Sequence, residues 1–291
     1  MRSFIQTVFK TVATVKVQWQ LYFIGAGGLG VFMLIAVLAD AGLEGNTSLI
    51  PSLVTSALLR RLLMGLAMGA TAICLIYSPW GACSGAHFNP ALTLTFACLG
   101  KIGRTDAFMY MLAQFIGGTL GVILAARLAG TPVQTSPVNY AVTVRGAAGV
   151  AVAFAMEVLI SAILMGTTLV ATNHPRLMRL TGLFCGMLIV AFVAFEAPYS
   201  GMSMNPARTV ASSLPSGIWT AAWLYWIAPP LGMALAALAY RAFAKHKLIA
   251  CAKLNHDTHH PCPFNCHFKA HGIHVPSLMH GVLVNNRSTI Q

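Results

Sequence analysis

The sequence predicts an all-α membrane protein with six transmembrane helices and two re-entrant half-helices, arranged as an inverted repeat. Its 291 residues are 57% hydrophobic and only 8% charged, whereas a soluble domain carries roughly a quarter charged residues. Six hydrophobic stretches are each long enough to cross a bilayer, which takes about 20 mainly apolar residues. The tripeptide Asn-Pro-Ala occurs twice, at matching places in two hydrophobic halves.

The hydrophobic stretches give the domain organisation. The expected spans lie near residues 19–41, 59–80, 107–128, 149–170, 181–198 and 219–241. We expect an N-terminal segment at 1–18, a membrane region at 19–244 with repeats at about 19–128 and 149–244, and a tail at 245–291. Because each half contains an odd number of spans, the second half is inverted relative to the first, which places their shared site near the bilayer midplane.

The basic residues give the expected orientation. The formal net charge is +12, which taken alone suggests nucleic acid. Most Lys and Arg residues, however, precede span one, follow span six, or lie in the loops after spans two and four. All these segments share one side of the membrane, which the positive-inside rule makes cytoplasmic. We therefore expect a multi-pass protein of the cell (inner or plasma) membrane with cytoplasmic termini and no nucleic-acid partner. Arg60 and Arg61 fit the rule poorly, and we expect them to snorkel at the outer interface.

The residues after each tripeptide form helices too short to span. The two copies are Asn89-Pro90-Ala91 and Asn205-Pro206-Ala207. Asparagine is a favoured N-cap, and proline suits the first helical position because no backbone N–H is needed there. Each Asn therefore begins a half-helix, and the two half-helices enter from opposite faces and meet. Irregular backbone at that depth is tolerated where it lines a water-filled cavity.

Such a meeting point has a defined chemistry. Two helix N-termini direct partial positive charge at one spot, where the amides of Asn89 and Asn205 also offer N–H donors. A water molecule accepting from both turns its own hydrogens away, and cations meet an electrostatic barrier. Arg208, three residues after the second Asn, adds a fixed positive charge facing the lumen.

These motifs resemble those of aquaporin-type channels of the major intrinsic protein family. The matching residues are 84–91 (Ser-Gly-Ala-His-Phe-Asn-Pro-Ala), 203–208 (Ser-Met-Asn-Pro-Ala-Arg), Glu157 and Tyr225-Trp226. The resemblance covers about residues 19–241. It implies a right-handed helix bundle with one pore per protomer, assembled as a homotetramer in membrane lipid. It also implies passive conduction of water and small neutral solutes such as glycerol and urea, with no enzymatic activity and no required cofactor.

The resemblance also implies a selectivity filter, formed by Arg208 with Val193 and Met202. The fourth filter position is Met68 or Gly69, depending on how span two is matched. Water-selective members of the family have His where this chain has Val193, which favours a wider, amphipathic pore that admits glycerol or urea.

Two other positions argue against glycerol as the substrate. Glycerol facilitators usually carry Asp after the filter Arg, and this chain has Thr209. Tyr225-Trp226 is also closer to the water-channel pattern. The substrate therefore stays open at this point.

Two residues are expected to support the re-entrant loops. The resemblance implies that Glu157 accepts hydrogen bonds from the second loop, and His87 is interpreted as a structural loop-packing residue. The family usually carries a counterpart Glu in span one, where this chain has Gly25-Ala26-Gly27-Gly28. We expect these small residues to allow close helix contact.

The tail has a composition of its own. Eight of the ten histidines lie between His246 and His280, together with three cysteines. We expect Zn²⁺ or a similar metal to bind Cys262, Cys266 and two histidines, since closely spaced Cys and His residues suit a tetrahedral site. The histidines considered are His267 and His271 first, then His259, His260 and His274.

Two alternatives accompany the predictions for the tail. One is a disordered tail with no specific metal. The other is a membrane sensor or scaffold whose tail binds metal or a partner, with transport secondary. In either case we expect no pore element in residues 245–291.

Overall fold

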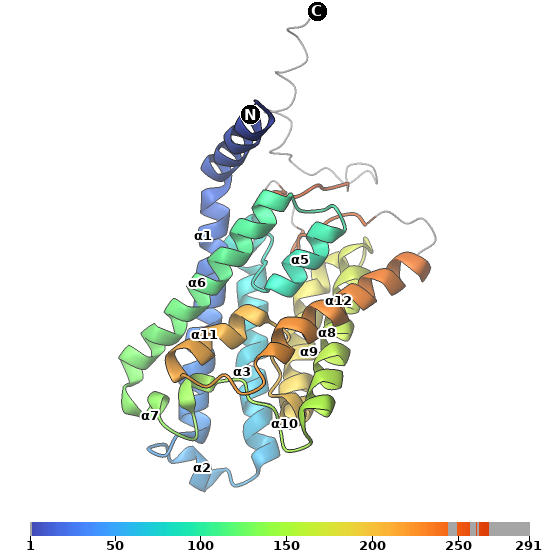
Figure 1. The fold of residues 1–291 in the computed structure, drawn as a ribbon. Coiled ribbons are helices and arrows are strands. Elements are labelled where there is room, and N and C mark those ends of the chain that lie inside the picture. The colour runs from blue at the N-terminus through green and yellow to red at the C-terminus, as the bar shows by residue number, and fades with distance from the viewer. Residues whose placement is uncertain (1, 244–248, 257–259, 261, 268–291) are drawn as a thin grey trace, which may run out of the picture.

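Figure 1 shows a computed structural model of the protein, which describes residues 2–243, 249–256, 260 and 262–267. Within this part of the chain every regular element is a helix, and six helices are long and apolar enough to cross a membrane. The spans are α1 (Arg2–Glu44), α3 (Ala57–Tyr77), α6 (Arg104–Ala129), α8 (Val150–Thr172), the continuous run of α9 (Thr181–Ala191), η3 (Phe192–Glu196) and α10 (Ala197–Ser200), and α12 (Trp223–Phe243). The shorter helices are α2 (Ile50–Leu53), α4 (Pro79–Ser84), α5 (Pro90–Cys98), α7 (Thr131–Gln134), η1 (Asn139–Ala141), η2 (Met178–Leu180) and α11 (Pro206–Ser216).

The predicted all-helical membrane fold is confirmed, with two differences in detail. Helix α1 begins at Arg2, so the expected N-terminal segment continues into the first span without a break. The fifth span contains the π-helical turn η3. A π turn inserts an extra residue into a helix and redirects the side chains around it; Val193 lies in this turn.

The two halves pair their spans in the same way. Helix α1 packs against α6 in the first half, and α8 packs against α12 in the second, while α3 and α9 pair across the halves. These contacts depend on glycine residues, which have no side chain to separate the helices. A Cβ on Gly121 would lie 2.1 Å from the carbonyl oxygen of Gly30, and one on Gly69 would lie 2.6 Å from that of Gly186. Glycine therefore allows backbones to approach closely, as small residues commonly do in membrane bundles.

The half-helices α5 and α11 begin as expected. The side-chain oxygen of Asn89 accepts from the Ala91 N–H at 2.9 Å, and that of Asn205 accepts from the N–H groups of Ala207 and Arg208. Proline occupies the first position of each helix, where it removes an N–H that has no helical partner. Helix α5 packs against α12 and α11 against α6, so each half-helix contacts a span of the opposite half.

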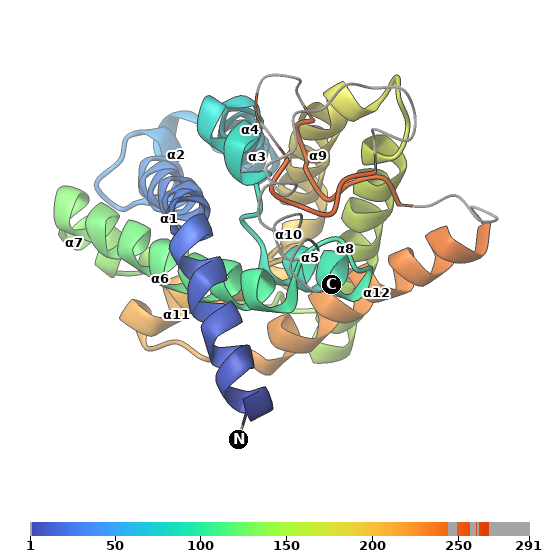
Figure 2. The ribbon, with the colours of Figure 1, turned by 90° about the horizontal axis from the view of Figure 1, so that it is seen from above.

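The described residues of the tail pack onto one end of the bundle, called the tail end below. Figure 2, seen from this side, shows the red tail segment lying across the space between α4, α9 and α8. Ile249, Cys251, Leu254 and Phe264 are buried there and belong to the main apolar core. The described tail residues thus bury their apolar side chains in the core of the bundle.

Candidate functional site

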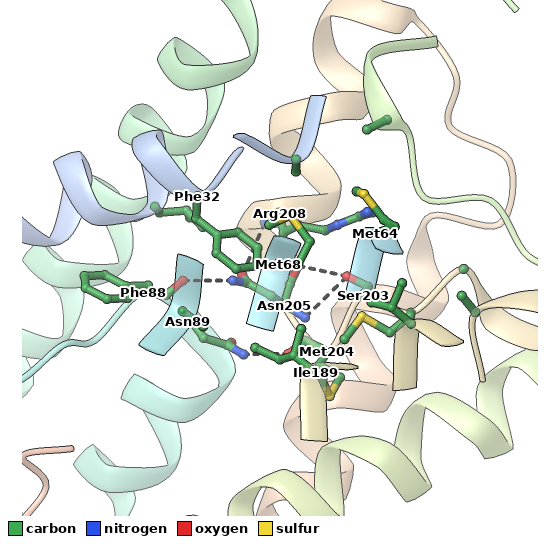
Figure 3. Close-up of a pocket in the computed structure, with 18 of the residues that line it drawn as sticks. Phe32, Met64, Met68, Phe88, Asn89, Ile189, Ser203, Met204, Asn205 and Arg208 are labelled. Atoms are coloured by element: carbon green, nitrogen blue, oxygen red, sulfur yellow. Dashed lines mark hydrogen bonds between the residues drawn. The ribbon is translucent and has the colours of Figure 1, made fainter. Parts of the chain in front are cut away.

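A cavity of about 310 Å³ lies within the bundle and is lined by both halves of the chain. Asn89, Asn205 and Arg208 all contribute to its wall, as the close-up in Figure 3 shows. Leu254 of the tail also lines it. At the end of the cavity opposite the tail, the charged lining residues are Asp40, Glu44, Arg60 and Arg61. Leu254 is thus a cavity-lining residue within residues 245–291, where we expected no pore element.

The two motif asparagines reach across the boundary between the halves. Asn89 donates from Nδ2 to the carbonyl oxygen of Met204 at 2.7 Å. Asn205 donates from Nδ2 to the carbonyl oxygen of Phe88 at 2.8 Å, and dashed lines mark both bonds in Figure 3. Each half therefore supplies the amide that holds the loop of the other half.

This arrangement leaves donors for a bound molecule. A side-chain amide carries two hydrogens, so one hydrogen on each Asn is not used by these cross-bonds. The N-termini of α5 and α11 add partial positive charge at the same level of the cavity. A neutral molecule that accepts hydrogen bonds is favoured there, and a cation is repelled.

Arg208 lies three residues after Asn205 and also lines the cavity. Its backbone N–H bonds to Asn205 Oδ1 at 3.2 Å, which fixes the residue in the first turn of α11. Its Nη1 is buried and has no hydrogen-bond partner among the described residues. Because an unsatisfied buried donor is costly, this group is suited to donate to a molecule passing through the cavity. The carboxylates of Asp40 and Glu157 lie close enough to offset part of its charge.

The expected filter residues share the cavity wall with one of the two candidates for the fourth position. Val193, Met202 and Met68 all line the cavity. Gly69 does not belong to its lining; it faces α9, where a Cβ would lie 2.6 Å from the Gly186 carbonyl oxygen. The structure therefore favours Met68 over Gly69 for the fourth filter position, which stays a prediction, because the missing side chain of Gly69 serves helix packing.

Several lining residues were not expected. Phe32, Met64 and Ile189 add apolar surface beside Arg208 and Asn205 (Figure 3). At the end opposite the tail, Arg60 forms an ion pair with Glu44 at 2.9 Å, and Arg61 donates to the Ala194 carbonyl at 3.1 Å. Both arginines line the cavity at this end, and the expectation that they snorkel at the outer interface stays a prediction.

Glu157 holds the second re-entrant loop. Its Oε1 accepts from Ser200 Oγ at 3.0 Å and from the Ser203 N–H at 2.6 Å, and its Oε2 accepts from the Met204 N–H at 2.8 Å. Ser203 and Met204 belong to the irregular stretch before α11, whose N–H groups have no helical partners. The carboxylate thus satisfies buried donors that would otherwise be costly.

The first loop is held differently, since α1 carries no equivalent acid. The ring of Phe88 fills the space beside Gly28, where a Cβ would lie 2.1 Å from a ring carbon. Gln114 donates to the His87 carbonyl at 2.7 Å. His87, which is fully buried, places Nδ1 3.2 Å from Thr93 Oγ1 and Nε2 2.8 Å from the Ala252 carbonyl oxygen. The last of these partners comes from the tail.

The tail brings four metal-binding side chains together. Cys251, His256, Cys262 and Cys266 place one donor atom each within 4.8 Å of one another. Two of them, Cys262 and Cys266, match the expected ligands. His267 does not join the group; its Nδ1 lies 2.9 Å from Lys101 Nζ. The other expected ligand, His271, and the alternatives His259 and His274 lie outside the described residues.

The surroundings of this group disfavour free thiolates. Burial raises the pKa of the Cys251 thiol well above its usual range, and the neighbouring thiols of Cys262 and Cys266 add to the shift. Burial also lowers the pKa of Lys101, an effect that thiolates at these cysteines would oppose. Negative charge at the group is therefore stable mainly beside a cation.

The fold and the cavity define a multi-pass membrane protein built as an inverted repeat around a central passage. A sequence profile of the major intrinsic protein family matches residues 16–240, and the chain belongs to that family. The described tail residues, 249 onwards, lie beyond the matched region.

Named relatives and a solved structure agree with this placement. Aquaporin TIP4-4 of Zea mays is 37% identical over 169 residues, which cover 54% of this chain and 62% of the relative. Aquaporin A of Dictyostelium discoideum is 32% identical over 193 residues, covering 65% and 68% respectively. The chain thus spans less than two thirds of the Zea mays protein. The X-ray structure of the aquaglyceroporin from Plasmodium falciparum has the same fold, with a TM-score of 0.64 at 19% identity over 78% of this chain and 96% of that one.

Proposed function

We propose that the protein is a passive channel that conducts water and small neutral solutes and excludes protons and ions. The observation that carries this proposal is the crossed pair of amide bonds from Asn89 and Asn205. They fix two donors and two helix N-termini at one level of a cavity shared by both halves. Such an arrangement stabilises a neutral acceptor and opposes cations. Conduction of this kind needs no cofactor.

The wall chemistry supports an amphipathic pore. Val193, Met202 and Met68 present apolar surface, while Arg208 presents a buried donor. A solute with both carbon and hydroxyl or amide groups satisfies both sides. We therefore propose glycerol or urea as substrates alongside water, with the balance among them set by Val193.

We place the tail end on the cytoplasmic side of the cell membrane. Lys101, Arg104, Arg176, Arg179 and Arg241 adjoin the ends of spans on that side. The positive-inside rule supports this orientation. We also propose a homotetramer in the membrane with one pore per protomer, on the ground of family membership, and native mass spectrometry in detergent tests it.

Transport is tested with the full-length chain reconstituted into liposomes. Stopped-flow light scattering would follow shrinkage under sucrose, glycerol and urea gradients, with empty liposomes as the reference. Each preparation is measured with bound Zn²⁺ and after a membrane-permeable zinc chelator, because the tail reaches the cavity. We expect faster water and solute movement than in empty liposomes in at least one condition, without proton or Na⁺ leak. Flux equal to that of empty liposomes in both conditions would contradict the channel and favour a sensor or scaffold.

The Cys and His side chains of the tail support a second proposal, which concerns metal binding. We propose that Cys251, His256, Cys262 and Cys266 bind one Zn²⁺ per chain. The donor set supports this assignment, because three thiolates and an imidazole form a common structural zinc site. Zinc content of the purified, tag-free protein tests it.

A further inference from the structure

The geometry of the four-ligand group suits a tetrahedral metal. Zn²⁺ bonds of about 2.0–2.3 Å place tetrahedral ligands roughly 3.6–3.8 Å apart. The Cys251 and Cys262 sulfurs are 3.2 Å apart, as are His256 Nε2 and the Cys266 sulfur. The sulfur separation is well beyond the roughly 2.05 Å of a disulfide. Because all four donor atoms lie within 4.8 Å of one another, small movements of the side chains suffice to bring them to these separations.

The charge around the group is also suited to a metal. When Zn²⁺ binds, the three thiols lose their protons to solvent and the imidazole binds in its neutral form. The resulting centre has a net charge of about −1 on the usual ligand charges. Lys101 is only 5% exposed and lies close enough to all three cysteines to interact with their charges. A buried lysine is costly unless paired, and this centre supplies the opposite charge.

The segment that carries the ligands is fastened around the mouth of the cavity at three places. The Leu254 N–H donates to the Gly85 carbonyl at 3.2 Å. Asn265 donates from its backbone N–H to the Lys101 carbonyl at 3.0 Å. At the end of α8, the Ala250 N–H donates to Asn173 Oδ1. The tail therefore spans from the first re-entrant loop to the second half of the bundle.

The contact with the first re-entrant loop is close. The Phe264 ring lies 4.9 Å from the His87 ring, centroid to centroid. A Cβ on Gly85 would lie 2.3 Å from a Phe264 ring carbon. Only glycine leaves room for this aromatic side chain, so the loop that leads into α5 and the tail are shaped to fit one another.

Within this frame, Leu254 enters the passage itself. It lines the same cavity as Asn89, together with Ile76, Leu164 and Cys185. These four lining residues are apolar or weakly polar, and Leu254 is 5% exposed. A buried leucine between apolar walls narrows the passage and opposes water, as hydrophobic constrictions do in other channels.

We infer that the tail is a metal-held plug: Zn²⁺ bound by Cys251, His256, Cys262 and Cys266 folds residues 249–256 and 262–267 over the tail end of the cavity and places Leu254 in its wall. Loss of the metal releases the segment and opens the passage. The described residues of the tail contain no helix or strand, so metal binding adds folding free energy to the packing of the tail on the bundle. The inference rests on the proposed channel function.

The metal is measured first, on the full-length, tag-free protein prepared with Zn²⁺ and a non-thiol reductant. Elemental mass spectrometry should find one zinc per chain in the wild type, and none in Cys262→Ser with Cys266→Ser. The matched control is Cys74→Ser with Cys98→Ser, because both cysteines are exposed and lie outside the group; it should retain the zinc. Absence of zinc from the wild type, or a Cys251–Cys262 disulfide in its place, would overturn the site.

The plug is measured next, by water permeability in liposomes. We expect the zinc-loaded wild type to conduct slowly, and the chelator or the Cys262→Ser, Cys266→Ser change to raise permeability severalfold. Leu254→Ala should raise it while leaving the zinc content unchanged, since it shortens only the side chain in the cavity. Leu53→Ala, at a site 78% exposed, should behave as wild type.

The outcomes separate the plug from the channel. If the zinc-loaded protein conducts and neither the chelator nor Leu254→Ala changes its permeability, the plug is wrong and the channel stands. If no variant conducts in any condition, the channel and the plug both fall, while the zinc content still reports on the four-ligand group.

Discussion

Tyr110 and Tyr225 hold the two re-entrant loops in the same way. The hydroxyl of Tyr110 donates to the Ser84 carbonyl at 2.8 Å, and that of Tyr225 donates to the Ser200 carbonyl. Each serine immediately precedes a glycine in the left-handed region, Gly85 and Gly201. The inverted repeat is therefore visible at the level of single hydrogen bonds that fix each loop before its half-helix begins.

Removing either hydroxyl should destabilise the protein. Tyr110→Phe and Tyr225→Phe each leave a buried carbonyl without its donor, which costs about 1–3 kcal/mol. Thermal unfolding in detergent should show a lower midpoint for both variants. The control is Tyr199→Phe, whose ring is 45% exposed. Midpoints equal to that of the control would mean that water replaces the tyrosine at these carbonyls.

Converting either motif asparagine to aspartate should impair the centre of the passage. The carboxylate of Asn89→Asp or Asn205→Asp still caps its half-helix, but it cannot donate to Met204 or Phe88 and adds negative charge beside their carbonyls. We expect a severalfold fall in solute flux, or entry of cations, and a stability loss of about 1–3 kcal/mol. Liposome flux and Na⁺ leak measure these effects, and Asn46→Asp, at an exposed loop contact, is the control. Unchanged flux and ion exclusion in both variants would remove the assignment of the pore centre.

Replacing Val193 should change the choice of solute. Val193→His adds volume and a hydrogen-bond donor to the wall of the cavity that Arg208 also lines. We expect the ratio of water to glycerol permeability to rise several times over the wild type. Val170→His, on the exposed surface of α8, should leave the ratio unchanged. A ratio that does not increase in Val193→His would show that this residue does not limit the passage.

Replacing Arg208 should weaken the barrier to cations. Arg208→Val removes a fixed charge and a buried donor and widens the cavity at that level. We expect larger solutes to pass and Na⁺ or proton leak to increase in liposomes. Arg127→Val, which removes an exposed charge, is the matched control. Wild-type selectivity in Arg208→Val would place the guanidinium outside the conduction route.

Two glycines provide a test of the contact between loop and tail. Gly85 and Gly100 both have positive φ, 85° and 73°, so alanine at either meets a similar backbone cost of about 1 kcal/mol. Only at Gly85 would the new Cβ meet the Phe264 ring; at Gly100 nothing lies within 4 Å. Gly85→Ala should make residues 249–256 and 262–267 more sensitive to limited proteolysis than Gly100→Ala does. Equal cleavage would show that the tail does not seat against this loop.

Much of the fold could be predicted because its determinants are local or repeated. Span length and hydropathy identify the six helices, and the chemistry of Asn caps and Pro first turns marks where α5 and α11 begin. The similar sequences around Tyr110 and Tyr225 indicate the internal repeat. None of these features depends on knowing which segments touch in space.

The rest depends on contacts between distant residues. A shift of one residue on a helix turns a side chain by about 100°, so sequence matching could not choose between Met68 and Gly69. The Asn205 amide and the Phe88 carbonyl are 117 residues apart. Likewise, Cys251 and His256 lie outside the close Cys and His spacing considered for the metal. The position of Leu254 depends on a backbone hydrogen bond to the distant Gly85.

The exchanged bonds between Asn89 and Met204 and between Asn205 and Phe88 bear on how the protein is made. As the chain leaves the ribosome, residues 88 and 89 enter the membrane while more than a hundred residues are still to be synthesised. The first loop therefore waits in the bilayer with an amide and a carbonyl that lack their final partners. Completion of the cavity therefore requires synthesis of the second half, and a chain truncated between α6 and α11 would leave the Asn89 amide and the Phe88 carbonyl without these partners.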